Sequence, residues 1–168
     1  GATVVGAIVD TNFWTSTTTN GGTLAQTGGQ VALVTNATTG GSSILQSVRR
    51  ARYTGGSANR FRAQVSCGDT GVANNTKRWG MFDGTDGAYF QLNATTFSAC
   101  VIKAGTSTAV PLASWSAATA IPSVTGINSY EIYITNAKVY FVVAGTLGHV
   151  YSASATTWTD TTNLPVRI

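Results

Sequence analysis

Six carboxylates are the residues of this chain that could act as acids, bases or nucleophiles. Cleavage of a glycosidic bond needs two carboxylates on either side of that bond, and the closest pair in the sequence is Asp83 and Asp86. Both lie in Asp83-Gly84-Thr85-Asp86-Gly87, a composition typical of a hairpin turn. Glu131 is the only glutamate, and we expect it to face outward from a strand. The acids therefore favour turn and surface roles.

His149 is the only histidine, and no Cys or carboxylate cluster accompanies it, which argues against a zinc site. A Ser-His-Asp triad could be drawn with His149 and Asp160, but no nucleophile elbow is present. The Asp83–Gly87 segment lacks the bidentate Glu of a hand-type calcium loop, and no glycine-rich phosphate loop is found. The sequence predicts no catalytic residue, no metal site and no cofactor.

The two cysteines, Cys67 and Cys100, each lie in a strand-like run with no CxxC spacing. They fit either buried free thiols or one disulfide. The sequence leaves both alternatives open.

Aromatic and arginine side chains are the remaining candidates for binding. Trp and Tyr bury a large area at low entropic cost and are enriched at interfaces, as is Arg. The alternative is that most of the aromatic rings fill the core and that the arginines solvate an outer sheet face or form a subunit contact. No nucleic-acid-binding motif accompanies the basic cluster, so nucleic acid is not an expected partner. The candidate interface or glycan contacts are Trp79, Tyr89, Trp115, Trp158, Arg50 and Arg52.

The elements that must position these residues are β-strands. In Phe61–Cys67, alternate residues are apolar while Arg62, Gln64 and Ser66 point the other way, and Tyr130–Thr135 repeats the pattern. Turns rich in Gly, Asn and Asp separate such runs: Asp83–Gly87, Asn93–Thr95, Asn136-Ala137 and Ala144-Gly145. The pattern predicts an all-β, antiparallel sandwich with one face of each sheet in the core.

Composition agrees with this prediction. The 168 residues include 28 Thr and 14 Ser, and only 10% are charged, against the usual ~25%. We expect a Gly/Thr-rich extension or set of edge strands over residues 1–41 and a sandwich over 42–168, or one continuous domain over 1–168. No apolar run approaches ~18 residues, so no membrane span is expected. The abrupt ends suggest a segment of a longer protein.

Two passages resemble known families. Ser129–Gly145 is similar to a three-strand meander of concanavalin-like sandwiches, with the pattern YEIxWTxxxVxFxVDG in lectin-like, laminin-G-like and glycanase modules; Ala144 stands where that pattern has Asp. This resemblance implies a jelly-roll or concanavalin-like fold. The glycanase members also carry a Glu-x-Asp-x-x-Glu strand that this sequence lacks, so we expect a protein that is not an enzyme.

The second resemblance runs from Asn59 to Ile168. Its passages Asn59–Val65, Val72–Asp83 and Ala88–Asn93 resemble a segment of structural proteins of tailed phages. It implies a non-enzymatic component of the virion surface, such as a capsid decoration, head-fibre or tail-fibre protein. Other virion proteins and further copies of the chain, as a homotrimer, would be its partners. The alternative is a carbohydrate-binding adhesin module that recognises host glycans. A glycan-active enzyme ranks third.

Overall fold

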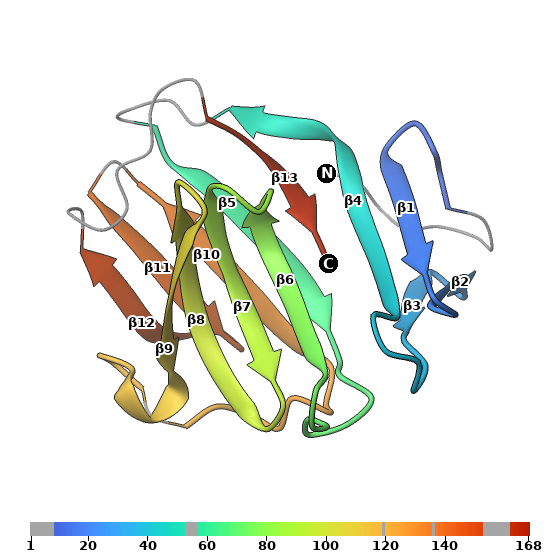
Figure 1. The fold of residues 1–168 in the computed structure, drawn as a ribbon. Helices are drawn as coiled ribbons and strands as arrows, with labels where there is room; N and C mark the ends of the chain where they lie inside the picture. Colours follow the sequence, from blue (N-terminus) through green and yellow to red (C-terminus); the bar gives the residue numbers. More distant parts are fainter. Residues whose placement is uncertain (1–8, 53–56, 119, 136, 153–161) are drawn as a thin grey trace. The chain divides into compact units, whose positions relative to one another are not determined.

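The computed structural model describes residues 9–52, 57–118, 120–135, 137–152 and 162–168 (Figure 1). They form thirteen strands and one short 3-10 helix, and no helix of the described residues is long and apolar enough to cross a membrane. The strands are β1 (Trp14–Thr19), β2 (Thr23–Thr27), β3 (Gln30–Val34), β4 (Ser42–Arg52), β5 (Asn59–Val65), β6 (Thr76–Phe82), β7 (Gly87–Asn93), β8 (Thr96–Lys103), β9 (Thr106–Pro111), β10 (Asn128–Ile134), β11 (Lys138–Val143), β12 (Thr146–Ser152) and β13 (Asn163–Arg167), and the 3-10 helix is η1 (Leu112–Ser114).

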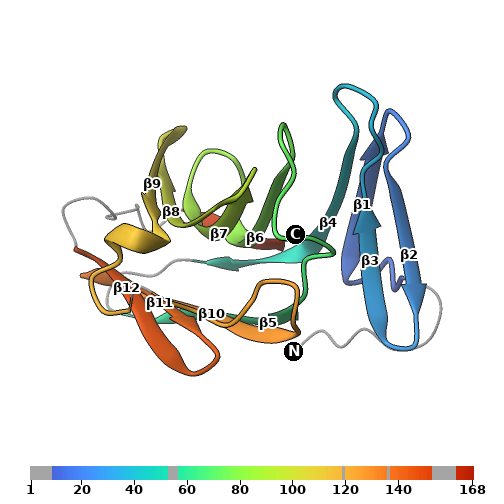
Figure 2. The same cartoon turned by 90° about the horizontal axis from the view of Figure 1, so that it is seen from below.

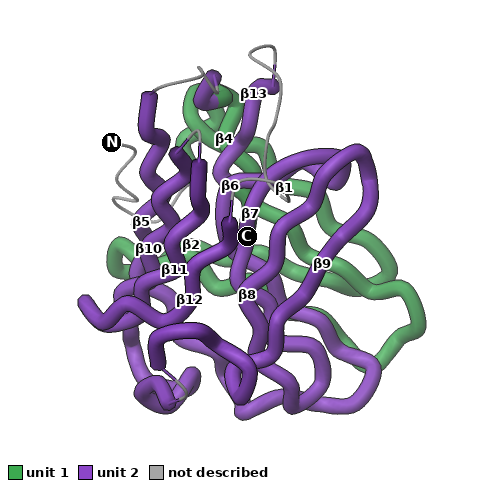
Figure 3. The backbone as a smooth tube through the Cα atoms, turned by 90° about the vertical axis from the view of Figure 1, so that its left-hand side faces the viewer, with its two compact units in different colours: residues 1–50, 167–168 green, residues 51–166 purple. Residues whose placement is uncertain are grey.

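The chain divides into two compact units, residues 1–50 with 167–168 and residues 51–166 (Figure 3). In the first unit β1 pairs with β4 from Trp14 opposite Ser47 to Thr19 opposite Ser42, and β2 pairs with β3 as a separate hairpin. The expected boundary at residues 41 and 42 therefore differs from the observed one. Because β4 begins at Ser42 and pairs with β1, residues 42–50 belong to the first unit.

The second unit is an antiparallel β-sandwich, which confirms the predicted fold class. One sheet has the strand order β13-β6-β7-β8-β9, and the other has the order β12-β11-β10-β5. Within this unit the two sheets lie face to face (Figures 1 and 2). The strands predicted from alternation, around Phe61–Cys67 and Tyr130–Thr135, are β5 and β10.

Predicted turns join neighbouring strands of the sandwich. Between β6 and β7, Asp83 Oδ1 accepts hydrogen bonds from the backbone N–H groups of Thr85 and Asp86 at 2.9 and 3.0 Å. Gly87 closes this turn at φ +131°, and a Cβ there would lie 2.2 Å from the carbonyl oxygen of Met81, so only glycine fits. Ala144 and Gly145, at φ +50° and +80°, make the tight turn between β11 and β12. Asn136 of another predicted turn lies outside the described residues.

Aromatic rings fill the space between the two sheets. Trp79 of β6 meets Tyr130 of β10 edge-on, with 5.0 Å between ring centroids, and Phe90 of β7 meets Phe141 of β11 at 5.2 Å. The hydroxyl of Tyr151 lies 3.2 and 2.9 Å from two carbonyl oxygens of β8 and β9, so it ties β12 to the opposite sheet. Burial raises the pKa of Tyr151, which keeps this hydroxyl protonated.

The cysteines are free thiols. Cys67 and Cys100 are both buried and are not joined in a disulfide. Of the two alternatives left open by the sequence, the structure therefore shows the buried thiols. Burial raises the pKa of Cys100 to about 12.

Candidate functional site

The most organised group of polar side chains lies on β5 and β10 of the second unit. Alternation along β10 buries Tyr130 and Ile132 in the core, and it places Glu131 and Tyr133 on the opposite side of the sheet. In the register of the antiparallel pair, Arg60 is opposite Tyr133 and Arg62 is opposite Glu131. Four side chains with complementary chemistry thus meet on one sheet face.

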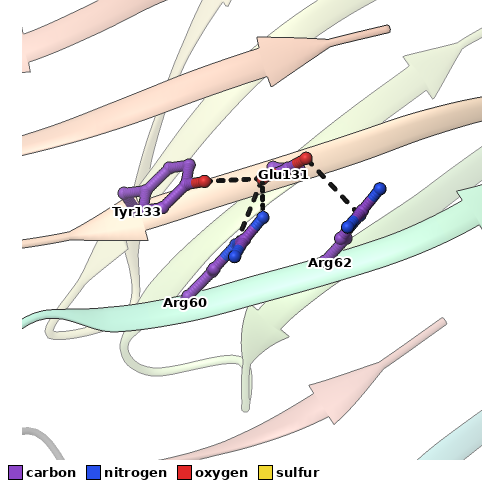
Figure 4. A network of polar contacts seen from close by, with 4 residues as sticks. All are labelled: Arg60, Arg62, Glu131 and Tyr133. Atoms are coloured by element: carbon purple, nitrogen blue, oxygen red, sulfur yellow. Dashed lines mark hydrogen bonds and ion pairs between the residues drawn. The ribbon is translucent and has the colours of Figure 1, made fainter. Parts of the chain in front are cut away.

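Glu131 is the centre of this network (Figure 4). Its Oε2 accepts hydrogen bonds from Nε and Nη2 of Arg60 at 3.1 and 2.6 Å, and from the hydroxyl of Tyr133 at 2.7 Å. The Arg60 guanidinium also lies over the ring of Tyr133, 5.1 Å from its centroid. Arg62 approaches from the other side, with its Nε 3.5 Å from Oε1. The carboxylate therefore fixes Arg60 and Tyr133 in one geometry.

These contacts keep the network charged at neutral pH. The hydrogen bond from Tyr133, followed by those from Arg60, holds the pKa of Glu131 below its usual value against the opposing effect of burial. The same carboxylate raises the pKa of Tyr133 and the pKa of Arg60 through its hydrogen bonds to them. Glu131 is therefore a carboxylate that accepts hydrogen bonds and orients its neighbours.

The aromatic part of the same face continues onto β11 and β12. Tyr140 of β11 is opposite Tyr133, and Val150 of β12 is opposite Tyr140. Tyr140 is half-buried, and among the described residues its ring stacks on no other ring or guanidinium. A row of Arg60, Tyr133, Tyr140 and Val150 thus crosses the sheet. We call the surface formed by Arg60, Arg62, Glu131, Tyr133 and Tyr140 the open face.

The other sheet of this unit presents a different outward surface. Tyr89 of β7 is paired with Gly80 and Cys100 and so points away from the core that contains Trp79 and Phe90. It nevertheless lies in a buried apolar cluster, which consists of Phe82, Tyr89, Cys100 and Ile102. We call this cluster the closed face. Arg78 lies over the Tyr89 ring at 5.5 Å and donates to the side-chain carbonyl of Gln91.

Three of the predicted contact residues are buried. Trp79, Tyr89 and Trp115 are 1%, 2% and 5% exposed, so they offer no free ring face to a sugar or a protein partner. Trp79 and Trp115 agree with the alternative that most aromatic side chains fill the core, and Tyr89 is buried in the closed face. Trp158 lies outside the described residues. Arg50 and Arg52 are exposed at the end of β4.

The residues of the open face were not among the predicted site residues. The alternation in Phe61–Cys67 placed Arg62 on a polar side. Glu131 was expected to face outward; it lies on the outer side of its sheet, where its neighbours leave it only 8% exposed. The pairing of β5 with β10 could not be predicted from the sequence, because it joins residues about 70 positions apart in the chain. The basic cluster around Arg60 was the available signal.

The other titratable groups have structural partners. Nδ1 of His149 accepts a hydrogen bond from the backbone N–H of Ser116, and burial lowers the pKa of this histidine. Asp69 pairs with Lys77 at 2.6 Å, and Asp86 accepts from the backbone of Ala104. Within the described ranges no group of three or more His, Cys, Asp or Glu side chains could hold a metal ion. Asp160, the third member of the triad considered from sequence, lies outside those ranges.

Comparison with known proteins identifies the fold. No family model and no curated protein matches the sequence. An endo-β-1,3-glucanase from Pyrococcus furiosus matches with a TM-score of 0.64 and 12% identity over 99% of this chain and 80% of that chain. A carbohydrate-binding module from Bacillus subtilis matches with a TM-score of 0.59 and 14% identity over 94% of this chain and 89% of that chain. A β-agarase A in complex with oligoagarose matches with a TM-score of 0.61 and 12% identity over 94% of this chain and 72% of that chain.

These comparisons correct one prediction and confirm another. The expectation of a protein that is not an enzyme is contradicted, because glucanases and an agarase share this fold. The lack of a Glu-x-Asp-x-x-Glu strand was too narrow a criterion, since catalytic carboxylates are recognised by geometry and not by one spacing. The predicted fold type is confirmed: the chain is a jelly-roll, concanavalin-like β-sandwich of the kind found in glucanases and carbohydrate-binding modules.

Proposed function

We propose that the chain binds a glycan through the open face. The observation that carries this proposal is the pair of tyrosines, Tyr133 and Tyr140, which lie opposite each other on adjacent strands. Arg60 and Glu131 hold Tyr133 in place. Sugar recognition combines a planar apolar ring with a few fixed polar groups, and this face supplies both. The fold is also shared with a carbohydrate-binding module and with glucanases, which supports the same class of ligand.

Tyr140 supplies the sharpest test, because its ring, unlike that of Tyr133, has no ring or guanidinium of the described residues stacked on it. We expect Tyr140→Ala to weaken binding of oligosaccharides about fivefold, as measured by calorimetric titration, since one aromatic contact contributes on the order of 1 kcal/mol. The ligands are oligomers of β-1,3-glucan, of agarose and of a uronic acid. Release of reducing ends from each oligomer is followed in the same samples, because enzymes share this fold.

The matched control is Arg78→Ala, which removes an exposed side chain from β6 of the opposite sheet. It should leave the affinity unchanged. Equal binding by wild type and Tyr140→Ala, with both proteins folded by circular dichroism, would rule out the open face as the glycan site.

A place on the surface of a tailed-phage particle stays a prediction from the sequence resemblance of residues 59–168. The expected homotrimer and the other virion proteins as partners also stay predictions. This role is compatible with glycan binding, since an adhesin on a particle performs both.

A further inference from the structure

We infer that the glycan bound at the open face is anionic and that Arg62 holds its anionic group. The inference rests on the proposed function and names the ligand class for the same site. Its first support is the charge of the face. Three cationic side chains among the described residues of this sheet face, Arg60, Arg62 and Lys138, stand against one carboxylate, Glu131.

The carboxylate does not satisfy both arginines equally. Oε2 of Glu131 accepts both hydrogen bonds from Arg60 and one from Tyr133. Arg62 reaches only the other oxygen, through Nε at 3.5 Å. In the described part of the chain, the two terminal nitrogens of Arg62 have no hydrogen-bond partner. Its side chain is 61% exposed, against 49% for Arg60.

Such a guanidinium is suited to an anion. Arginine presents parallel N–H donors that match the oxygens of a carboxylate or a sulfate, and a charge-assisted pair of this kind is about twice as strong as a neutral hydrogen bond. Glu131 restrains Arg62 by contacting Nε, which leaves the outer donors free (Figure 4). Arg62 therefore combines a restrained side chain with unused donors.

Gln64 is a second polar side chain on the same side of β5 as Arg62. It is exposed two residues further along β5, on the same side of the sheet and roughly 6.6–6.8 Å away. It is opposite Ser129 of β10. An amide and a hydroxyl next to the guanidinium can bind sugar hydroxyls while the tyrosines contact the ring. The ligand with this set of groups is a polysaccharide that carries carboxylates or sulfate esters.

The test compares oligosaccharides of equal length: neutral β-1,3-glucan, a carboxylated oligogalacturonate and a sulfated carrageenan oligomer. We expect wild type to bind at least one anionic oligomer about tenfold more tightly than the neutral one. Arg62→Gln should remove this preference, and Arg62→Lys should retain only part of it, because lysine keeps the charge and loses the paired donors. The carboxylated and sulfated arms distinguish the two sources of the anion.

Two controls separate the possible outcomes. Arg78→Gln removes an exposed arginine from the opposite sheet and should leave the preference unchanged. Raising salt from 0.05 to 0.5 M should weaken anionic binding alone. Equal affinity for neutral and anionic oligomers, or an equal loss for both in Arg62→Gln, would overturn the inference while the proposed function stands. If no oligomer binds, both fail.

Discussion

The outward surfaces of the two sheets of the second unit are built from the same alternation of side chains, but they differ in how far their residues are buried. On β6–β8 the outward residues include Phe82, Tyr89 and Cys100, and they are buried in the closed face. On β5, β10 and β11 they include Arg60, Arg62 and Tyr140, and they reach solvent. A tyrosine of the first sheet is therefore a packing residue, while a tyrosine of the second is available to a ligand.

The difference teaches where binding can arise in a sandwich of this kind. Outward residues that pack into a buried cluster, as in the closed face, are not available to a ligand. The sheet that carries the open face has one apolar side, which is in the core, and one polar side. Exposed residues on the polar side can therefore change with little effect on packing. On β10, Ile132 faces the core and Glu131 lies on the side of the open face.

Replacing a tyrosine in each face gives the largest expected contrast. Tyr89→Ala should lower the free energy of unfolding by about 3 kcal/mol, because a buried ring is lost and a cavity remains. Tyr140→Ala should cost about 1 kcal/mol or less, since its ring is only half-buried. Urea unfolding followed by fluorescence measures both values. Similar losses for the two variants would mean that the closed and open faces do not differ in packing.

A more conservative pair refines this contrast. Tyr89→Phe keeps the ring and removes the hydroxyl, which lies 2.7 Å from the hydroxyl of Ser107. It should cost only about 1 kcal/mol, the usual contribution of one hydrogen bond. A loss as large as that of Tyr89→Ala would assign the effect to the hydrogen bond and not to packing.

The sequence was enough to predict strands and turns but not the residues of the open face, and particular residues show why. Period-two patterns are local, so Phe61–Cys67 and the turn at Asp83–Gly87 could be predicted from neighbouring residues. The meeting of Arg62 with Glu131 depends on which strands pair and in which register, and hydrophobic packing across the whole unit decides this. Trp79 and Tyr89 lie on opposite sides of their sheet, yet both are buried, Trp79 between the two sheets and Tyr89 in the closed face.

The acid sensitivity of the open face is the next expected effect. The pKa of Glu131 is lower in the folded chain than its ordinary value of 4.5, chiefly through the hydrogen bond from Tyr133. A carboxyl whose pKa falls on folding stabilises the fold above its unfolded pKa, and this contribution is lost as the pH drops through the folded pKa. Glu131→Gln should therefore lower the melting temperature by about 2–4 °C at pH 7. The difference from wild type should shrink as the pH is taken below 4.5.

Asp69→Asn is the matched control for this titration. Its carboxyl also has a lowered pKa, caused first by the hydrogen bond from Lys77, and it lies outside the open face. It should show the same direction of pH dependence while leaving glycan affinity unchanged. Glu131→Gln should weaken affinity as well, because Arg60 and Tyr133 lose the acceptor that positions them. A Glu131→Gln variant with wild-type affinity would show that the network stabilises the sheet without organising a site.

The smallest expected effect is the labelling of the two native thiols by a thiol reagent. It tests whether the residues of the closed face stay buried. Burial raises the pKa of Cys100 to about 12 and also raises the pKa of Cys67, so few thiolates form at pH 8. We expect a thiol reagent to label neither cysteine in the folded chain within the time that it labels both in urea. Arg62→Cys supplies the comparison, because a thiol on the exposed open face should react at once. Rapid labelling of Cys100 in the native chain would show that the closed face opens, and a buried tyrosine such as Tyr89 would then be accessible to a ligand after all.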